Sequence, residues 1–151
     1  MTKQFIFLFG IMTATLAYGQ KYCCGESGAP QFDGNDLISY YDGKILKGSP
    51  GHKVQIDGQV YLFHNEANRI RFQEDPQKYL PSYGGWCSIA MSLDALVEPN
   101  YNYYRFDQNG KILFFEVRAF LNGITLWEKD TIGNKIKADR NYKNLLNAQN
   151  K

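Results

Sequence analysis

The chain has 151 residues, with 17 Lys or Arg against 15 Asp or Glu and a formal net charge of +2 at pH 7. A balance so close to neutral gives no electrostatic basis for binding nucleic acid or an acidic membrane surface. The length suits one domain with its own core. Aromatic residues make up 15% of the chain, which indicates a core filled by tyrosine and phenylalanine or an aromatic-lined cleft.

Residues 1–19 are typical of a secretory signal peptide. Lys3 precedes an apolar run over 5–16, and the small residues Ala17 and Gly19 end the segment. The run is shorter than the roughly 20 residues that cross a bilayer. We therefore expect cleavage after Gly19 and an exported protein, periplasmic or secreted, with no membrane insertion once the leader is removed.

The cysteines fall in two places. Cys23 and Cys24 lie in a Gly- and Pro-containing stretch, residues 20–32, that we expect to be a mobile tail, and Cys87 lies far downstream. Three is an odd number for an exported chain, so one disulfide with one thiol left over, or a bond to another molecule, is allowed. Cys87 paired with either tail cysteine would join the tail to the domain. A bond between the two neighbours would strain the peptide unit.

Asp57–Gly58 predicts the two-residue turn of a β-hairpin, because the flanking residues are rich in Val, Ile, Tyr and Phe. The pairs expected across this turn are Ile56 with Gln59, Val54 with Tyr61, and His52 with Phe63. The returning strand is apolar on both faces, so we expect it to be central in the domain.

Two short helices are predicted next. Asn65 can cap a helix over 66–75, which ends before a proline. Asp75 followed by Pro76 marks the start of a second helix over 76–80.

A third helix is predicted over 86–96, after the turn that Gly84–Gly85 allows. Helical spacing gives this helix an expected core stripe of Trp86, Ile89, Ala90, Leu93 and Val97. Cys87 and Met91 share the adjoining flank with Asp94, since residues four apart lie on one face.

The last third predicts a second hairpin over 102–117, turning at Asn109–Gly110, and two more helices over 118–130 and 134–147. The charged residues of the stretch 137–142 are expected to be surface and capping groups. Hairpins and helices thus alternate along the chain. The predicted fold class is α+β, a single small domain of two β-hairpins interleaved with short helices.

Three stretches resemble the YHS-domain family in its exported, stand-alone form. They are "DGNDLISYYDGKILKGS", "GQVYLFHNEANRIRFQEDPQKYLPSYGGWCSIAMS" and "WEKDTIGNKIKADRNY". The middle stretch carries the most specific pattern, a Tyr-x-Phe, a short helix ending in Phe, Asp-Pro-x-Lys-Tyr, and Tyr-Gly-Gly-aromatic-Cys. The resemblance implies a YHS-type domain over 33–147 and, since the family is commonly regarded as metal-associated, a metal ion as partner.

The chain departs from the metal-pump-associated members of that family at three positions. Those members carry Cys-Ser after the Tyr-x-Phe and another cysteine four residues further on. Here the positions hold His64, Asn65 and Asn68. Histidine can still bind a metal, whereas asparagine is a poor ligand.

The first candidate site combines Cys87, His64 and Met91. Imidazole and thiolate suit zinc or copper, and a thioether would favour Cu(I). Possible surrounding residues are Tyr61, Tyr83 and Trp86. This combination predicts non-enzymatic binding or handling of a soft or borderline metal, copper or zinc. The competing interpretation is that His64 hydrogen-bonds locally while Cys87 and Met91 fill the core.

The alternative prediction is a thiol-based redox protein or a small-ligand-binding protein that uses Cys87 without metal. A helix N-terminus beside Gly84–Gly85 would lower the pKa of that thiol. His64 could act as its base, although no third group is evident to orient the imidazole. The sequence therefore leaves an enzymatic role uncertain and favours binding. Tyr40, Tyr79 and other tyrosines could line a ligand cleft.

Overall fold

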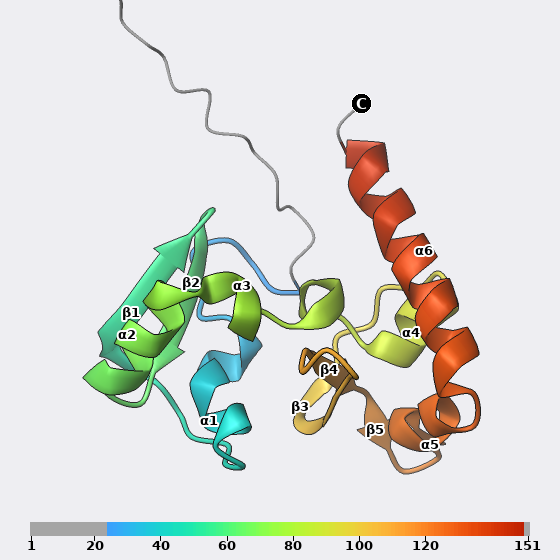
Figure 1. Ribbon diagram of the computed structural model, residues 1–151, viewed down its shortest axis with the longest axis horizontal. Coiled ribbons are helices and arrows are strands. Elements are labelled where there is room, and N and C mark those ends of the chain that lie inside the picture. Colours follow the sequence, from blue (N-terminus) through green and yellow to red (C-terminus); the bar gives the residue numbers. More distant parts are fainter. Residues whose placement is uncertain (1–23, 150–151) are drawn as a thin grey trace, which may run out of the picture.

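The computed structural model describes residues 24–149 and has the predicted α+β class (Figure 1). The predicted signal peptide and Cys23 lie outside the described residues. The strands pair as three separate antiparallel sheets, β1–β2, β3–β4 and β5–β6. In chain order the elements are η1 (Phe32–Gly34), α1 (Leu37–Tyr41), β1 (Ser49–Ile56), β2 (Gln59–Phe63), α2 (Glu66–Glu74), α3 (Pro76–Tyr79), η2 (Ser82–Gly85), α4 (Ser88–Ser92), β3 (Asn100–Phe106), β4 (Ile112–Phe115), β5 (Val117–Arg118), β6 (Leu121–Asn122), α5 (Gly123–Glu128) and α6 (Thr131–Gln149).

The first hairpin confirms the turn at Asp57–Gly58 and differs from the prediction at its far end. Ile56 pairs with Gln59 and Val54 with Tyr61, as expected. The expected pair of His52 with Phe63 is wrong, because the register shifts and Phe63 pairs with Ser49 instead. A bulge of this kind adds residues to one strand only. The alternation of apolar and polar residues along a strand does not predict where such a bulge occurs.

Strand β4 separates two clusters of buried side chains. All four residues of β4 are buried, with 2% exposure or less. Ile112 and Phe114 belong to the first cluster, while Leu113 and Phe115 belong to the second. Successive side chains of a strand point to opposite faces, so one short strand supplies both cores. β4 pairs with β3 as predicted, but Phe106 lies opposite Ile112, so the loop includes Gln108 as well as the predicted Asn109–Gly110.

The first cluster, which we call the aromatic core, lies among α1, the first hairpin, α2 and α3. Its large rings include Tyr40, Phe63 and Phe72, each with no exposed surface. Neighbouring rings meet at centroid distances such as 4.9 Å for Phe63 and Phe72 and 5.4 Å for Tyr40 and Phe114. Aromatic pairs at this spacing are favourable.

Helices α2 and α3 confirm the predicted caps. The Asn65 side chain accepts a hydrogen bond from the backbone N–H of Asn68 at 2.8 Å. Asp75 accepts from the N–H of Lys78, with Pro76 in the first turn. These side chains satisfy helix N–H groups that have no partner inside the helix.

Helix α4 is shorter than predicted and leaves part of the expected core stripe outside. It ends at Ser92, and Leu93, placed in the stripe, is 72% exposed. Asp94 adopts a left-handed φ of 59°, which stops the helix. The stripe is therefore correct only up to Ala90 and again at half-buried Val97.

The predicted helix over 118–130 is wrong in its first half. Residues 117–122 form the small hairpin β5–β6, and α5 begins only at Gly123. A Cβ at Gly123 would approach the carbonyl oxygen of Glu116 too closely, so the tight return of the hairpin requires glycine there. The final helix is confirmed and longer than predicted, with Gly133 inside α6. No helix within residues 24–149 is both long and apolar enough to cross a membrane.

The tail predicted over 20–32 is packed against the domain from Cys24 onward. Cys24 and Gln31 are 2% and 1% exposed. The backbone N–H of Cys24 donates to the carbonyl of Gly84, and that of Gln31 donates to Val60, both at 2.8 Å. Residues 24–31 therefore contact η2 and the first hairpin through buried side chains and backbone hydrogen bonds.

Candidate functional site

Cys87 is a buried thiol at the start of α4. It is 1% exposed, and its Sγ accepts a hydrogen bond from the backbone N–H of Glu116 at 3.3 Å. Its own N–H donates to the carbonyl of Val97 at 2.9 Å. Cys87 is not in a disulfide, so the alternative in which it pairs with Cys24 is not what the structure shows. The thiol is held in place and shielded from solvent.

Met91 and Cys87 both belong to the second cluster of buried side chains, the one that contains Leu113 and Phe115 of β4. We call this cluster the second core. Met91 is 2% exposed, and its N–H donates to the Cys87 carbonyl, closing one turn of α4. Asn141 of α6 donates to the Met91 carbonyl at 2.9 Å. The structure therefore brings together the two sulfur-bearing residues that the sequence placed on one helical flank.

His64 lies elsewhere, on the exposed side of the first hairpin. Its backbone N–H donates to Asp36 at 2.8 Å, and its Nδ1 lies 3.3 Å from the carbonyl of Lys47. Figure 1 shows β2 and α4 in opposite halves of the molecule. Within residues 24–149 no group of three or more His, Cys, Asp or Glu side chains is arranged to hold a metal ion. His64 therefore stands apart from Cys87 and Met91.

The three aromatic residues expected around the site divide between the cores. Tyr61 is buried in the aromatic core, and Tyr83 in the second core. Trp86 is half-buried and packs against both. Of the three, Tyr83 also lines a cavity.

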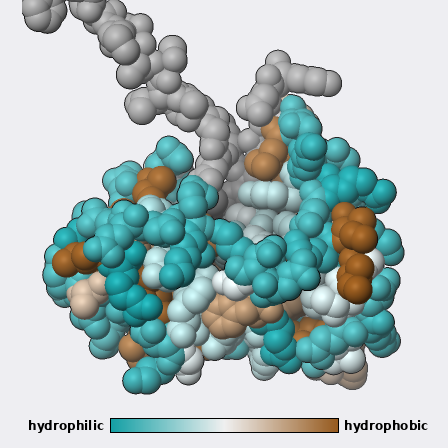
Figure 2. All heavy atoms as spheres, viewed as in Figure 1, coloured by the Kyte–Doolittle hydropathy of each residue, from teal (hydrophilic) through white to brown (hydrophobic). Residues whose placement is uncertain are grey.

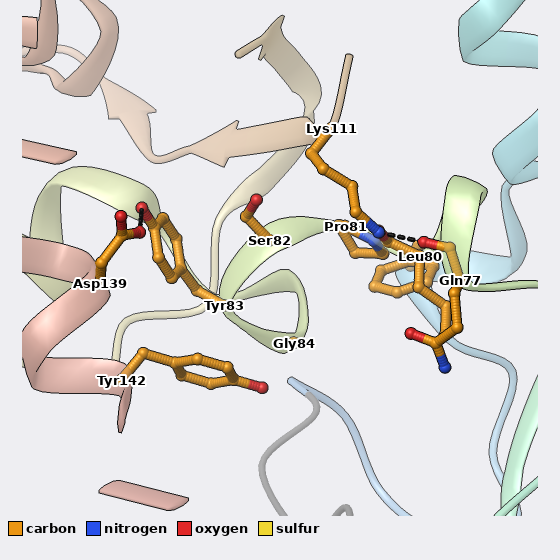
Figure 3. A pocket seen from close by; sticks show the side chains of 10 residues that line it. Gln77, Leu80, Pro81, Ser82, Tyr83, Gly84, Lys111, Asp139 and Tyr142 are labelled. Carbon is orange, nitrogen blue, oxygen red and sulfur yellow. Dashed lines mark hydrogen bonds between the residues drawn. The ribbon is translucent and has the colours of Figure 1, made fainter. Parts of the chain in front are cut away.

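That cavity has a volume of about 300 Å³ and lies between η2 and α6 (Figure 3). One wall is formed by Tyr83 with Asp139 and Tyr142 of α6, and the facing wall by Lys111 at the start of β4 with the end of α3. The lining residues are Phe32, Gln77, Leu80, Pro81, Ser82, Tyr83, Gly84, Lys111, Asp139 and Tyr142. Figure 3 shows the Ser82 hydroxyl between the two walls.

A chain of charges fixes the α6 wall. The Tyr83 hydroxyl donates to Asp139 at 2.8 Å, and Lys135 contacts the same carboxylate at 2.9 Å. Lys135 also lies 3.8 Å from the carboxylate of Asp107, whose side chain is 5% exposed. Burial, followed by the neighbouring Asp139, raises the pKa of Tyr83, so this phenol remains a donor at every physiological pH.

Lys111 fixes the opposite wall. Its ammonium donates to the carbonyl of Leu80 at 3.1 Å and to that of Gln77. These carbonyls at the end of α3 have no helical partner, so a cation satisfies them well. Burial lowers the pKa of Lys111, against the attraction of Asp107 and Asp75.

Sequence reasoning named Tyr83 but missed Lys111, Asp139 and Tyr142 as members of one site. They come from segments that are 28 to 59 residues further along the chain. One local signal was present: Asp139 and Tyr142 are three apart, so they share a face of a helix. That signal gives no indication of what the face contacts, and the charges of the stretch 137–142 predict a surface position.

No protein-family model matches this chain, and neither a curated protein nor a solved structure matches it.

Proposed function

We propose that this protein is an exported domain of the YHS type that binds a small ligand in the cavity between η2 and α6, without acting on it chemically. The observation that carries the proposal is the cavity itself, about 300 Å³ with aromatic and polar walls held in fixed positions. A concave site with a few placed polar groups is the usual form of a small-molecule site. Export and the YHS type rest on the sequence patterns of residues 1–19 and 33–142.

The charges around the cavity favour a neutral ligand. Asp139 is paired with Lys135, and Lys111 is held by backbone carbonyls. A charged ligand would therefore have to displace an existing partner. The hydroxyl of Ser82 and the rings of Tyr83 and Tyr142 suit a compact molecule with hydroxyl or amide groups on one side and an apolar face on the other, such as a monosaccharide.

Cys87 has no part in this binding site. It does not line the cavity, and its 1% exposure keeps the thiol from a ligand there. A nucleophile must approach its substrate within hydrogen-bond reach of a base, and His64 lies in the other half of the molecule. The alternative prediction from the sequence combined a thiol-based redox role with small-ligand binding. The geometry supports ligand binding without chemistry at the thiol of Cys87.

The test is an NMR titration of the ¹⁵N-labelled protein with neutral monosaccharides, glucose and N-acetylglucosamine as first probes. We expect amide shifts confined to η2, the middle of α6 and the start of β4. Ser82→Phe, which fills the space between the walls, should weaken binding at least about tenfold. Thr125→Phe, a matched change on the exposed side of α5, should leave binding unchanged. Shifts spread over the surface, or equal binding by Ser82→Phe, would contradict the proposal.

A second candidate function, soft-metal handling, is favoured by one observation. Cys87 and Met91 lie together in the second core, four residues apart on α4. A thiolate and a thioether are the donors that Cu(I) prefers, whereas zinc requires four ligands. Among the predicted ligands, this pair fits copper and leaves out His64.

Measuring how much copper the protein retains distinguishes a site formed by Cys87 and Met91 from the predicted three-ligand site that also includes His64. The purified protein is loaded with Cu(I), dialysed, and analysed for copper. We expect Met91→Leu, close to Met in volume, to lose copper while His64→Ala retains it. Equal and negligible copper in the unmodified protein and both variants would remove metal handling from consideration. Loss in His64→Ala would restore the three-ligand site predicted from the sequence.

A further inference from the structure

The near-neutral net charge hides a strong separation of charge along the chain. Residues 24–116 contain eight Lys or Arg against twelve Asp or Glu, a net charge of −4. Residues 117–149 contain six Lys or Arg against three Asp or Glu, a net charge of +3. Such asymmetry between two parts of one chain points to interaction with a charged surface. The second part comprises β5, β6, α5 and α6.

Helix α6 presents a stripe to solvent that is apolar at one end and basic at the other. Ile132 and Ile136 are 77% and 63% exposed, and Arg140 and Lys143 continue the same line at helical spacing. The opposite side of α6 is anchored in the second core through fully buried Ala138. Figure 2 shows a hydrophobic patch along the lower part of α6.

The turn of the β5–β6 hairpin adds a second apolar group. Phe120 at its tip is 104% exposed, which means that its ring touches nothing in the protein, and Leu121 beside it is 40% exposed. Arg118 flanks the tip with a side chain that is 65% exposed and that is paired with the carboxylate of Glu116 at 2.7 Å. Single exposed apolar residues are ordinary, but a wholly bare phenylalanine beside a basic residue is not.

Hydrogen bonds keep the tip and the stripe at one corner of the molecule. The β5–β6 hairpin leads directly into α5. The side chain of Asn134 on α6 donates to the carbonyls of Leu126 and Trp127 on α5, at 3.2 and 3.1 Å. Figure 1 shows β5, α5 and the beginning of α6 together at the lower right. We call this surface the apolar–basic corner. Its basic residues are Arg118, Arg140 and Lys143, and its exposed apolar residues are Phe120, Leu121, Leu126, Ile132 and Ile136.

We propose that the apolar–basic corner docks on the surface of an anionic phospholipid bilayer. Exposed aromatic and aliphatic side chains enter the headgroup boundary, while Lys and Arg are attracted to anionic headgroups. The charge separation adds orientation, because the part with net charge −4 is repelled from the same surface. The corner presents the fully exposed ring of Phe120 at its tip, so it fits a deformable lipid surface better than a rigid protein partner.

The test is co-sedimentation of the chain beginning at Gln20 with vesicles, since the apolar run of residues 5–16 would itself bind lipid. Two vesicle types are compared, phosphatidylcholine alone and phosphatidylcholine with phosphatidylglycerol. We expect binding to the anionic vesicles to be at least about tenfold tighter and to weaken as salt is raised.

Variants test which surface binds. Phe120→Ser combined with Ile136→Ser should weaken binding to anionic vesicles at least about tenfold. Leu93→Ser is the matched control, because Leu93 is 72% exposed but lies in the negatively charged part. Arg140→Gln with Lys143→Gln should weaken only the binding that depends on phosphatidylglycerol. All these positions are exposed, so a thermal melt should show each variant folded.

Three outcomes would overturn the proposal. The first is no preference for anionic vesicles, and the second is an equal loss of binding in Leu93→Ser. The third is a concentration-dependent dimer in size-exclusion chromatography that Phe120→Ser abolishes, which would assign the corner to a second copy of the chain. None of these results bears on the cavity, because the apolar–basic corner contains none of its lining residues.

Discussion

The aromatic core and the second core share strand β4 but differ in what holds them and in what lies beside them. The aromatic core is organised around a buried carboxylate, Asp36, which has no exposed surface. It accepts hydrogen bonds from the N–H groups of Ile38 and His64 and from the side chain of Asn68, at 2.7 to 2.8 Å. One side chain thus ties α1, β2 and α2 together.

The second core has no comparable centre within the described residues. Its buried polar link is Asn141, which donates to carbonyls of Met91 and Ser92. This core contains the buried thiol of Cys87, and the cavity and the apolar–basic corner lie beside it. The first half of the molecule is therefore scaffold, and the features suited to binding gather where the packing depends on α6.

The largest expected effect is on the scaffold side. Asp36→Ala leaves two buried donors and one part-buried donor without an acceptor, so we expect a loss of about 3–5 kcal/mol in the free energy of unfolding. Asn141→Ala, the matched change in the second core, should cost about 1–2 kcal/mol. Urea denaturation of both variants checks the difference. Equal losses would show that the two cores do not differ in this way.

A pair of glycines tests how closely the first segment packs on η2. Gly85 has a φ of 86°, and a Cβ there would overlap the ring of Phe32. Gly43 has a φ of 71° but open space around it. We expect Gly43→Ala to cost about 1–2 kcal/mol through backbone strain alone, and Gly85→Ala about 2 kcal/mol more. Similar melting temperatures for the two variants would mean that the Phe32 contact yields easily.

The tyrosines of the aromatic core predict a loss of stability at alkaline pH. Burial is the main cause that raises the pKa of Tyr40 from 10.0 to about 12. A raised pKa means that the neutral phenol is favoured by folding. Its contribution is therefore complete below pH 10 and is lost as the pH rises from 10 to 12.

The size of this alkaline loss is about 2–3 kcal/mol for Tyr40. Tyr40→Phe should be less stable at neutral pH, because it loses the hydrogen bonds to Asn35 and to the Tyr101 carbonyl. Its stability should fall less steeply than that of the unmodified protein between pH 10 and 12. Parallel pH profiles would show that Tyr40 does not carry the effect.

The smallest effect is expected at Cys87. Cys87→Ala removes the acceptor of the Glu116 N–H and leaves a small void, which should cost about 1–2 kcal/mol. Because the thiol is 1% exposed, iodoacetamide should modify it much more slowly in the folded protein than a model thiol. Rapid modification at neutral pH would instead favour a reactive cysteine and revive the thiol-based hypothesis.

Local sequence predicted the elements well where the signals are local. The two-residue turn at Asp57–Gly58 is confirmed, because such turns depend on residues that accept positive φ. The second hairpin forms where it was predicted, but its loop also includes Gln108, since the N–H of Asp107 donates to the carbonyl of Lys111. The caps at Asn65 and Asp75 are confirmed for a similar reason, since a capping side chain reaches only two or three residues ahead.

The errors lie where distant contacts override local pattern. Helical spacing placed Leu93 in the core, yet α4 ends before it. The bulge that moves Ser49 opposite Phe63 and the hairpin in place of a helix over 117–122 follow from packing that a short window does not contain. The same bulge explains why His52 does not pair with Phe63 as predicted.

Local sequence is sufficient to predict the α+β class, the turn at Asp57–Gly58, the caps and the shared flank of Cys87 and Met91, since each depends on residues within a few positions of one another. Long-range packing separates His64 from Cys87 and buries Asp36 at the centre of the scaffold. The same packing brings Lys111, Asp139 and Tyr142 to Tyr83 around a cavity. It also gathered the separated charges and bare apolar residues of the last segment into one corner. These arrangements depend on which face of each helix is buried, and that is fixed by the packing of the whole chain.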